Sequence, residues 1–203
     1  MSESRPSVLI TGANGFVGTR LCRTFMAAGF DVFAGVRKTA DLSALDGLAV
    51  TFRHGDITQS DGLARVVEGV DYVVHNAGIV KAKSGPAFTA VNVDGVRNVC
   101  EAVAAHNPNV KRMVLISSLA ASGPSVEGRP VREEDAPHPV TTYGRSKLAG
   151  EQVAMPFADR LPLVILRPSG VYGPGDKEVF SFFESLNRHI RPYIGDSSRK
   201  LQL

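Results

Sequence analysis

Residues 7–18 read SVLITGANGFVG, a short apolar run followed by three glycines at three-residue spacing. An apolar run that ends in a glycine turn and continues as an amphipathic segment predicts a strand, a tight turn and a helix. Gly12 would permit the turn, Gly15 would let a ligand approach the backbone, and Gly18 would let the helix pack on the sheet. Unpaired N–H groups at the start of such a helix attract anions, so the stretch predicts a phosphate-binding loop. A purely structural glycine turn is the alternative.

The rest of the chain repeats this alternation of short apolar runs and longer amphipathic ones. Residues 72–74 and 113–116 are apolar at successive positions, as expected for parallel strands that helices cover on both faces. We therefore predict an α/β fold, a doubly wound parallel sheet of the Rossmann type. The predicted strands are residues 7–11, 31–36, 50–53, 72–75, 114–118 and 163–167, and the predicted helices are residues 16–28, 60–67, 88–106 and 141–160.

Composition restricts the class of protein. The 203 residues are 43% hydrophobic, which suits a domain with a sizeable core, and 23 basic against 20 acidic residues give a net charge of +3. The basic residues are scattered, so a nucleic-acid partner is not favoured. No apolar run approaches the ~18 residues of a spanning helix, and none at the start of the chain is typical of a signal peptide. We expect a cytoplasmic protein with no membrane partner.

Cysteine and histidine offer no evident metal site. Cys22 and Cys100 are too few for a disulfide framework or a zinc site of their own. Both lie within amphipathic segments, where a small buried hydrophobe is the better interpretation. His75 ends a predicted strand, and we expect it to be packed or hydrogen-bonded rather than catalytic. The sequence therefore predicts no metal.

The residues after the second predicted strand bear on the ribose of a dinucleotide. An acidic residue there accepts a hydrogen bond from the 2′-hydroxyl of NAD, whereas a basic one pairs with the 2′-phosphate of NADP. Arg37 and Lys38 occupy this position, while Asp31 lies at the other end of the strand, so NADP is favoured over NAD. A solvated pair of loop residues is the alternative. After the third strand, Asp56 would hold the adenine edge, unless it serves as a turn residue or helix cap.

Tyr143 and Lys147 stand four residues apart on a predicted helix, so their side chains share one face. A free tyrosine has a pKa of about 10, and lowering it by ~3 units requires about 4 kcal/mol of preferential stabilisation of the phenolate. A lysine charge and a bound nicotinamide cation supply such stabilisation. Ser117 and Ser118 end the fifth strand, at the sheet edge where the glycine turn lies, and a hydroxyl there would donate to a substrate oxygen. A surface helix pair is the alternative for Tyr143 and Lys147.

Taken together, these motifs resemble the extended short-chain dehydrogenases, the NAD(P)-dependent epimerase/dehydratase group, over nearly the whole chain. The resemblance implies hydride transfer at an alcohol or ketone carbon, with Tyr143 as general acid/base, Lys147 on the nicotinamide ribose and Ser118 orienting the reacting oxygen. Ser118 is preferred because its separation from Tyr143 is similar to the usual separation in this family, and Ser117 remains an alternative. The residues that carry the resemblance are Gly12, Gly15, Gly18, Asp56, Asn76, Ala77, Gly78, Asn92, Ser118, Tyr143, Lys147, Arg167 and Pro168.

The same resemblance implies a set of cofactor contacts and a homodimer. Asn92 would brace the active-site helix, and Pro168 and Val171 would flank the nicotinamide. In this family the helices that carry Asn92 and Tyr143 often pair with a second subunit. The predicted cofactor-binding residues are Gly12, Asn14, Gly15, Phe16, Val17, Gly18, Arg37, Lys38, Asp56, Ile57, Asn76, Ala77, Gly78, Asn92, Tyr143, Lys147, Pro168 and Val171.

The domain organisation follows from the same likeness. Residues 1–175 are predicted to form the NAD(P)-binding Rossmann domain, and residues 176–203 the start of a substrate lobe that is largely missing from the chain. Residues 123–138 contain five of the chain's glycines and prolines among charged residues, which predicts a long surface loop. Loops of this length are often functional, so we expect this one to help choose the substrate.

Departures from the family pattern narrow the activity. Leu119 and Ala120 stand where sugar-nucleotide dehydratases carry an acidic pair, which disfavours dehydration. Residues 36–38 resemble the reductase branch, which includes 3β-hydroxysteroid dehydrogenases. We predict an oxidoreductase or epimerase acting on a nucleotide sugar. The alternatives are an NADPH-dependent ketone reductase or 3β-hydroxysteroid dehydrogenase-like enzyme, and a non-catalytic Rossmann protein that senses NADP.

Overall fold

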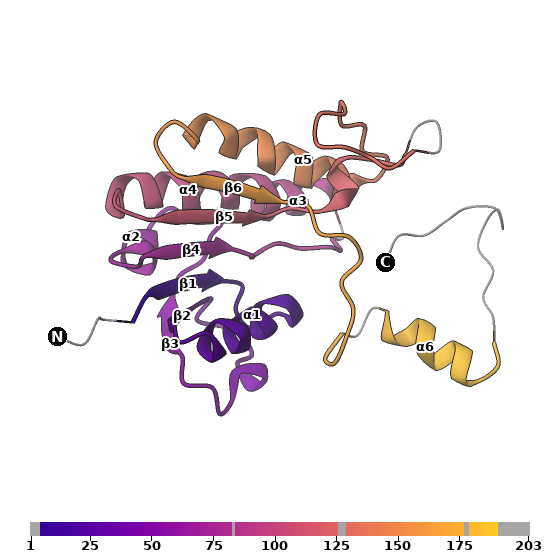
Figure 1. Cartoon of the computed structure of the whole chain (residues 1–203), viewed down its shortest axis with the longest axis horizontal. Helices are drawn as coiled ribbons and strands as arrows, with labels where there is room; N and C mark the ends of the chain where they lie inside the picture. The colour runs from indigo at the N-terminus through magenta and orange to yellow at the C-terminus, as the bar shows by residue number, and fades with distance from the viewer. Residues whose placement is uncertain (1–4, 83, 126–128, 177–178, 191–203) are drawn as a thin grey trace. The chain divides into compact units, whose positions relative to one another are not determined.

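Six parallel strands form the centre of the fold in the computed structural model of this protein (Figure 1), which describes residues 5–82, 84–125, 129–176 and 179–190. The strand order is β3-β2-β1-β4-β5-β6, the doubly wound order whose connections reverse direction between β1 and β4. The predicted α/β fold of Rossmann type is confirmed. The strands are β1 (Ser7–Thr11), β2 (Asp31–Val36), β3 (Thr51–His54), β4 (Tyr72–His75), β5 (Arg112–Ile116) and β6 (Leu163–Leu166).

Helices cover both faces of this sheet (Figure 1). On one face α1 (Phe16–Ala27) packs through Leu21 and Phe25 onto β1 and β2. On the other face lie α2 (Leu63–Val67), α4 (Gly95–His106) and α5 (Thr142–Ala154). The shorter elements are α3 (Gly85–Thr89), a π-helical turn η2 (Ala90–Asp94), and the 3-10 turns η1 (Ser43–Leu45), η3 (Leu119–Ala121) and η4 (Met155–Phe157).

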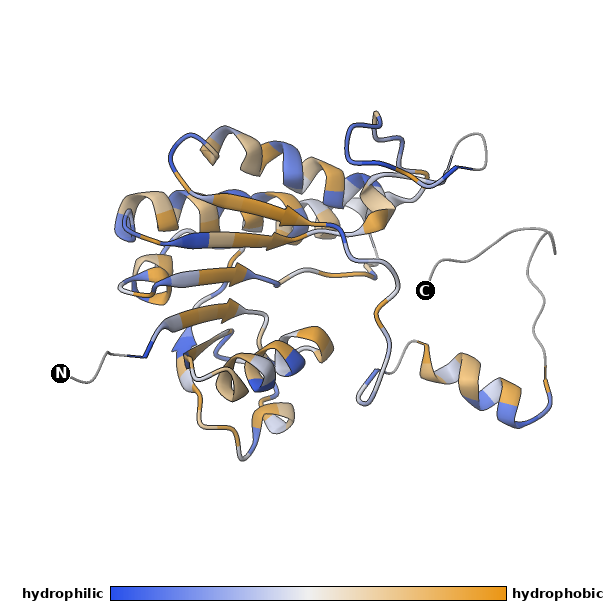
Figure 2. Cartoon of the chain, viewed as in Figure 1, coloured by the Kyte–Doolittle hydropathy of each residue, from blue (hydrophilic) through white to orange (hydrophobic). Residues whose placement is uncertain are grey.

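The strands are buried on both faces, as their apolar runs predict. Val8, Leu9 and Ile10 of β1 are each 0% exposed, although successive side chains point to opposite faces. The hydrophobic strands stand out at the centre of Figure 2. Burying a side chain of this size stabilises the fold by about 1.5–3 kcal/mol, so the two apolar faces hold the helices in place.

Three strands have the predicted bounds, and the other elements differ for local reasons. The predicted helix 60–67 begins only at Leu63, because Gly62 before it has a φ of +86°. The predicted helix 88–106 starts earlier, at Gly85, and a π-helical turn interrupts it. The predicted helix 141–160 ends at Ala154, where Pro156 of η4 follows. The strands predicted at 50–53, 114–118 and 163–167 lie at 51–54, 112–116 and 163–166, and the helix at 16–28 ends at Ala27.

The chain divides into two units, Met1–Pro168 and Ser169–Leu203. The first holds the whole sheet. The second contains α6 (Phe180–Asn187), with half-exposed Phe182 and Phe183 in edge-to-face contact. The predicted boundary after residue 175 falls inside the second unit, and residues 191–203 of the predicted lobe lie outside the described residues. Among the helices of the described ranges, none has the length and apolar character needed to cross a bilayer.

Candidate active site

The glycine turn after β1 has no room for side chains at two of its three glycines. Gly12 has a φ of +64°, and a Cβ there would lie 2.8 Å from the Cα of Ala77. A Cβ on Gly18 would lie 2.1 Å from the carbonyl oxygen of Gly12, so this first turn of α1 packs directly on the loop. Only glycine satisfies both positions.

Gly15 differs, because it faces open space. It is exposed and is the N-cap residue of α1, and a Cβ there would lie 3.4 Å from the Gly12 carbonyl oxygen. Phe16 and Val17, the first residues of the helix, follow it directly. The first N–H groups of a helix have no intrahelical partner and carry a partial positive charge. The turn therefore fits the diphosphate of a dinucleotide.

The segment after β4 connects this turn to the rest of the site. The backbone N–H of Ala77 donates to Thr11 Oγ1 at 3.1 Å, and Asn76 Nδ2 donates to the carbonyl of Gly12 at 3.4 Å. β1 and β4 are neighbours in the sheet, so these contacts lie at the carboxyl edge where the strand order reverses. Open α/β sheets bind their ligands in this position.

Gly78 lies in close contact with two buried polar side chains. A Cβ on Gly78 would lie 3.2 Å from Asn92 Oδ1 and 3.6 Å from Lys147 Nζ. Asn92 is 1% exposed and lies on the π-helical turn η2. Its side chain exchanges two 2.9 Å hydrogen bonds with the backbone of Ile79 and donates a third, at 2.9 Å, to Ser146 of α5. Asn92 thus contacts the helix that carries Tyr143.

Tyr143 and Ser118 come together at the start of α5. The helix is capped by Thr141, whose hydroxyl accepts from the Gly144 N–H at 2.9 Å. Burial raises the pKa of Tyr143 above its ordinary value, and a hydrogen bond from the Ser118 hydroxyl acts in the opposite direction. Ser118 Oγ also accepts from the Ala120 N–H at 3.1 Å, which leaves its own hydrogen to donate to the phenol.

The two serines after β5 face different partners. Ser118 caps η3 and contacts Tyr143, whereas Ser117 is 4% exposed and donates to the carboxylate of Glu151. A Cβ on Gly144 would lie 2.3 Å from the Ala120 carbonyl oxygen, so α5 packs directly on the turn that Ser118 begins. Of the two candidates left open by the sequence, the geometry places Ser118 beside the phenol.

Lys147 lies one helical turn after Tyr143 and is 7% exposed. Its Nζ donates to the carbonyl of Ile116 at 2.7 Å, at the end of β5. Burial lowers the pKa of Lys147 to about 8, and the negative charge of Glu151 opposes this shift. The amine lies on the same face of α5 as Tyr143, four residues further along the helix.

The residues predicted to read the adenosine lie apart from this group. Arg37 and Lys38 follow β2 and are exposed. Asn14 Nδ2 donates to the carbonyl of Asp41 at 3.1 Å. Asp56 Oδ1 accepts from both the N–H and the hydroxyl of Thr58, at 2.9 and 2.8 Å. Asp56 therefore acts as a turn residue, which was the alternative to its predicted role at the adenine. One oxygen of its carboxylate, Oδ1, makes both hydrogen bonds of this turn.

The predicted cofactor contacts also include Ile57, Pro168 and Val171, and each has different surroundings. The carbonyl of Ile57 accepts from Asn98 Nδ2 at 2.8 Å, and its side chain packs against Gly95 of α4. The carbonyl of Pro168 accepts from the Leu119 N–H at 2.9 Å, which places Pro168 next to the Ser118 turn. Val171 belongs to the second unit, so its predicted place beside the nicotinamide stays a prediction.

His75 and the cysteines have the structural roles expected from the sequence. His75 is 0% exposed and its Nδ1 pairs with Thr11 Oγ1 at 2.8 Å. Burial, followed by the nearby charge of Lys147, lowers the pKa of His75 to about 3. Cys22 and Cys100 are both 0% exposed, and burial raises their pKa values to about 11 and 12. The interpretation of these three side chains as packed residues is confirmed.

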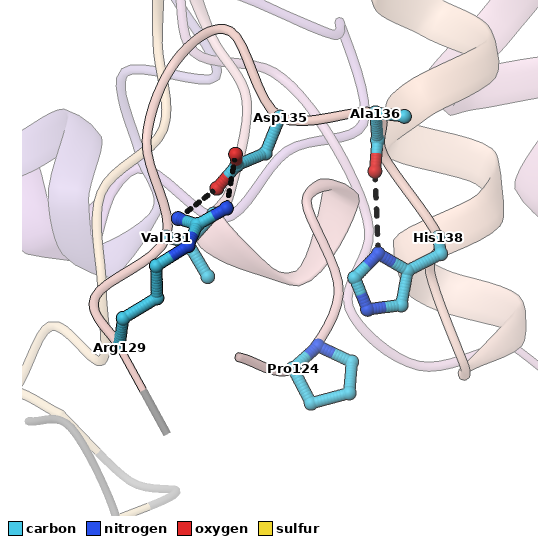
Figure 3. A pocket seen from close by; sticks show the side chains of 6 residues that line it. All are labelled: Pro124, Arg129, Val131, Asp135, Ala136 and His138. Atoms are coloured by element: carbon cyan, nitrogen blue, oxygen red, sulfur yellow. Dashed lines mark hydrogen bonds and ion pairs between the residues drawn. The ribbon is translucent and has the colours of Figure 1, made fainter. Parts of the chain in front are cut away.

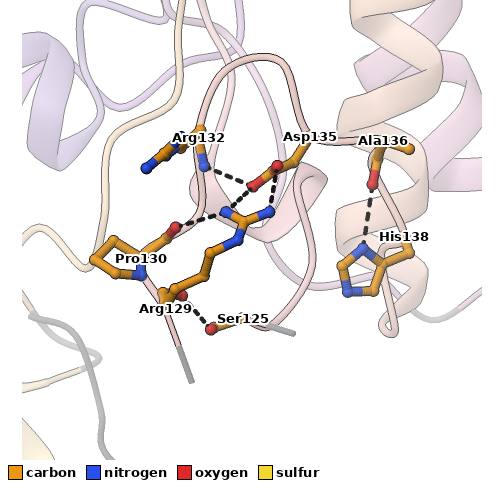
Figure 4. Close-up of polar contacts among 7 residues, drawn as sticks. All are labelled: Ser125, Arg129, Pro130, Arg132, Asp135, Ala136 and His138. Carbon is orange, nitrogen blue, oxygen red and sulfur yellow. Dashed lines mark hydrogen bonds and ion pairs between the residues drawn. The ribbon is translucent and has the colours of Figure 1, made fainter. Parts of the chain in front are cut away.

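The loop of residues 123–138 closes on itself. At its base the N–H of His138 donates to the carbonyl of Ser122 at 2.9 Å. Within it Arg129 and Asp135 face each other (Figure 3) and form a two-pronged ion pair at 2.8 and 2.7 Å. The backbone N–H of Arg132 adds a third bond to Asp135 at 2.8 Å (Figure 4). A small pocket in this loop is lined by Pro124, Arg129, Val131, Asp135, Ala136 and His138.

The sequence analysis missed one pair of residues near the site, Glu151 and Arg167 as ionic partners. They form a salt bridge at 2.6 Å, and the Glu151 side chain is 6% exposed. The sequence does contain a pattern that could have identified Glu151. Tyr143, Lys147 and Glu151 recur at four-residue spacing and so share one helix face. A glutamate on a buried face requires a partner.

Comparisons with known proteins agree with this geometry. Residues 8–194 match the NAD dependent epimerase/dehydratase family. The ceramide reductase of Caulobacter vibrioides is 34% identical over 199 residues, which cover 98% of this chain and 57% of that protein. The 3 beta-hydroxysteroid dehydrogenase/Delta 5-->4-isomerase of Mycobacterium tuberculosis is 32% identical over 211 residues, 96% of this chain and 55% of that protein.

Among solved structures, the UDP-glucuronic acid 4-epimerase of Bacillus cereus in complex with NAD is 25% identical, with a TM-score of 0.77. The match covers 91% of this chain and 64% of the other. The chain spans little more than half the length of the two sequence relatives. The family match over residues 8–194 agrees with the resemblance in the motifs. The chain belongs to the NAD-dependent epimerase/dehydratase family, the extended short-chain dehydrogenases.

Proposed function

We propose that this protein is an NAD(P)-dependent oxidoreductase that moves a hydride between the nicotinamide and an alcohol or ketone carbon. One observation carries the proposal: the Tyr143 phenol is hydrogen-bonded to Ser118, with the Lys147 amine one helical turn away. Both groups lie at the carboxyl edge of the sheet, where the glycine turn also lies. A protein that only senses NADP needs the glycine turn, and it has no use for the phenol, amine and hydroxyl together.

The residues present fit a dinucleotide cofactor. Gly15 is exposed at the start of α1, and Gly78 has no side chain to separate a ligand from Lys147 Nζ, so a dinucleotide would lie across the strand ends between them. Asn14, Phe16 and Val17 complete the turn. The nicotinamide, when bound, accepts or supplies the hydride. We keep NADP as the preferred form, supported by the two exposed cations Arg37 and Lys38 after β2.

The protein's own groups would manage the substrate oxygen and its proton. Ser118 would donate a hydrogen bond to that oxygen and so hold it beside the phenol. Tyr143, whose pKa burial raises, is a protonated phenol at neutral pH and would act as the acid in the reductive direction. The Lys147 ammonium would lower the pKa of the phenol and let it act as the base in the oxidative direction.

For the substrate we propose a lipid-like alcohol or ketone, acted on by a reductase or a 3β-hydroxysteroid dehydrogenase-like enzyme. The support is the similarity to a ceramide reductase and a steroid dehydrogenase, at 34% and 32% identity, together with residues 36–38. A nucleotide sugar, the substrate that the sequence analysis placed first, is the second candidate. Its support is the similarity to a UDP-glucuronic acid 4-epimerase. We also keep the proposal of a homodimer, which rests on the family resemblance.

The test is an assay of the complete protein with NADPH and NADH. Panels of 3-ketosteroids, keto-sphingolipids and UDP-sugars would be followed by nicotinamide absorbance, and product analysis would detect an epimerisation that causes no net change in absorbance. We expect turnover with a lipid ketone, and Tyr143→Phe serves as the matched inactive variant. Absence of any product with all three panels, or equal rates in the Tyr143→Phe variant, would contradict the proposal.

A further inference from the structure

A buried ionic cluster lies directly beside the catalytic group. The Glu151 carboxylate, 4% exposed, accepts from Arg167 Nε at 2.9 Å and from Arg167 Nη2 at 2.6 Å, and also from the Ser117 hydroxyl. The third nitrogen of the guanidinium, Nη1, donates to Ser122 Oγ at 3.1 Å. Two-pronged pairs of this kind are directional, so each partner fixes the orientation of the other.

Each member of this cluster lies next to a residue of the candidate site. Glu151 is one turn beyond Lys147 on α5, and Ser117 directly precedes Ser118. Ser122 follows η3, the turn that Ser118 caps, and Arg167 follows β6. The cluster therefore connects the helix that carries the phenol and the amine to both ends of the segment that carries the active hydroxyl.

The cluster also supplies the charges around the Lys147 amine. A buried ammonium loses hydration, which favours its neutral form, whereas a carboxylate one turn away favours the charged form. Around Lys147 stand Glu151 and Tyr143 on its own helix and neutral His75 on β4. Cationic Arg167, after β6, pairs with Glu151. Glu133, in the loop of residues 123–138, contributes to raising the pKa of Arg167. Glu151 is the anion that acts on the amine and opposes the effect of its lost hydration.

Burial of such a pair is expensive, and a packed hydrophobic pair of similar volume is often at least as stable. Stability alone is therefore a poor reason for an ion pair at this position. We propose that Glu151, held by Arg167 and Ser117, is a positioning residue that keeps the Lys147 amine charged and holds the Ser118 segment against the Tyr143 helix. The catalytic consequence rests on the proposed function, whereas the effect on Lys147 does not.

The test follows the ionisation of Lys147 without substrate or cofactor. Protein labelled with ¹³C at the lysine ε-carbon would be titrated by NMR, and the Lys147 signal would be assigned from its loss in the Lys147→Arg variant. Glu151→Gln keeps the shape of the side chain and removes its charge, so we expect the Lys147 midpoint to fall by about one pH unit. Asp159→Asn, the same change in charge at an exposed residue after α5, should leave the midpoint unchanged.

Arg167→Gln provides a second variant with the opposite expected sign. It removes the cation that pairs with Glu151, so the carboxylate acts on the amine without a competing positive charge and the midpoint of Lys147 should rise. This arm keeps the test decisive if Glu151→Gln does not fold, which circular dichroism would report. Unchanged midpoints, or shifts of the same sign in the two Gln variants, would overturn the proposal.

Steady-state kinetics of the complete protein extends the test to catalysis. In Glu151→Gln we expect the alkaline limb of the kcat/KM profile to move to lower pH by the same amount as the NMR midpoint, and Glu151→Asp should restore most of that shift. A purely structural role would lower kcat and leave the limb in place, which would overturn the positioning role. Absence of turnover in every form, wild type included, would contradict the proposed function and leave the NMR result standing.

Discussion

The Ser118 hydroxyl is hydrogen-bonded to the phenol of Tyr143, which lies 25 positions further along the chain. The contact exists because Gly144 lets α5 pack directly on η3, whose first N–H groups Ser118 caps. A side chain at position 144 would separate the two elements and with them the two hydroxyls. The geometry of the candidate site thus depends on a residue that takes no part in the chemistry.

The first prediction concerns this pair of hydroxyls. Tyr143→Phe removes the proton donor and keeps the ring, so we expect turnover to fall by about 100-fold or more. Dissociation constants for NADPH, measured by fluorescence titration, should change less than about threefold, because the glycine turn is untouched. Ser118→Ala should lower turnover as well and leave cofactor affinity equally unchanged. A large loss of affinity in either variant would contradict the assigned roles.

A second prediction concerns the choice between NADP and NAD. Arg37→Ala removes an exposed cation after β2 and should weaken NADPH binding by about tenfold, while NADH binding stays the same. The matched control is Arg65→Ala, an exposed arginine on α2. Because an exposed ion pair is screened by salt, the difference between wild type and Arg37→Ala should shrink at high ionic strength. Equal losses for the two cofactors would assign Arg37 to general binding instead.

A third prediction concerns the close approach at Gly18. Gly18→Ala places a Cβ 2.1 Å from the Gly12 carbonyl oxygen, so α1 or the loop must move. We expect the free energy of unfolding in urea to fall by about 2 kcal/mol or more, with loss of cofactor binding. Gly85→Ala is the control, because a Cβ there meets no described atom within 4 Å. Equal free energies of unfolding for the two variants would contradict this prediction, because the loop would then accommodate the added Cβ at little cost.

A fourth prediction concerns His75 and acid. Thr11 Oγ1 accepts from the Ala77 N–H and pairs with His75 Nδ1, while His75 Nε2 is buried with no hydrogen-bond partner among the described residues. Protonation of the ring would place a positive charge inside the core. The pKa of His75 is lowered to about 3 in the fold, against about 6.5 in the unfolded chain. Between these values the unfolded chain binds the extra proton, so stability is lost as the pH falls below about 6.5 and is fully present above it.

Urea unfolding between pH 4.5 and 8 measures this effect. We expect His75 to contribute a slope of up to about 1.4 kcal/mol per pH unit below pH 6.5, and the His75→Asn variant should lack that slope. His106→Asn, the same change at an exposed position of α4, should keep it. A wild-type profile that matches the His75→Asn profile in slope would mean that His75 is protonated in the native state.

The fold and the local motifs could be predicted because each depends on residues that are adjacent in the sequence. The apolar run of residues 7–11 has the bounds of β1, and Gly29 with a φ of +84° follows the end of α1. The glycine spacing predicted a crowded turn, and the clashes at Gly12 and Gly18 agree with it. Periodicity also identified α5, although its end at Ala154 depends on Pro156 in the following turn.

Contacts between residues far apart in the sequence were harder to predict, because no local sequence pattern indicates them. The pairing of Glu151 with Arg167 joins a helix to the end of a strand, and only the fold brings the two charges together. The π-helical turn that holds Asn92 interrupts a segment whose periodicity is continuous in the sequence. The sequence also left Asp56 with two roles, and the bonds to Thr58 are what identify the turn.

The bond from the His138 N–H to the Ser122 carbonyl has a consequence for how this scaffold acquires new specificities. The loop leaves and re-enters the Rossmann unit at adjacent points, so its middle can change in length or composition at a small cost in closure entropy. Replacement of residues 124–137 by the loop of a relative would exchange this segment and preserve Ser118, Tyr143 and Lys147. Chimeras joined at Gly123 and His138 would therefore test directly whether the loop sets substrate preference.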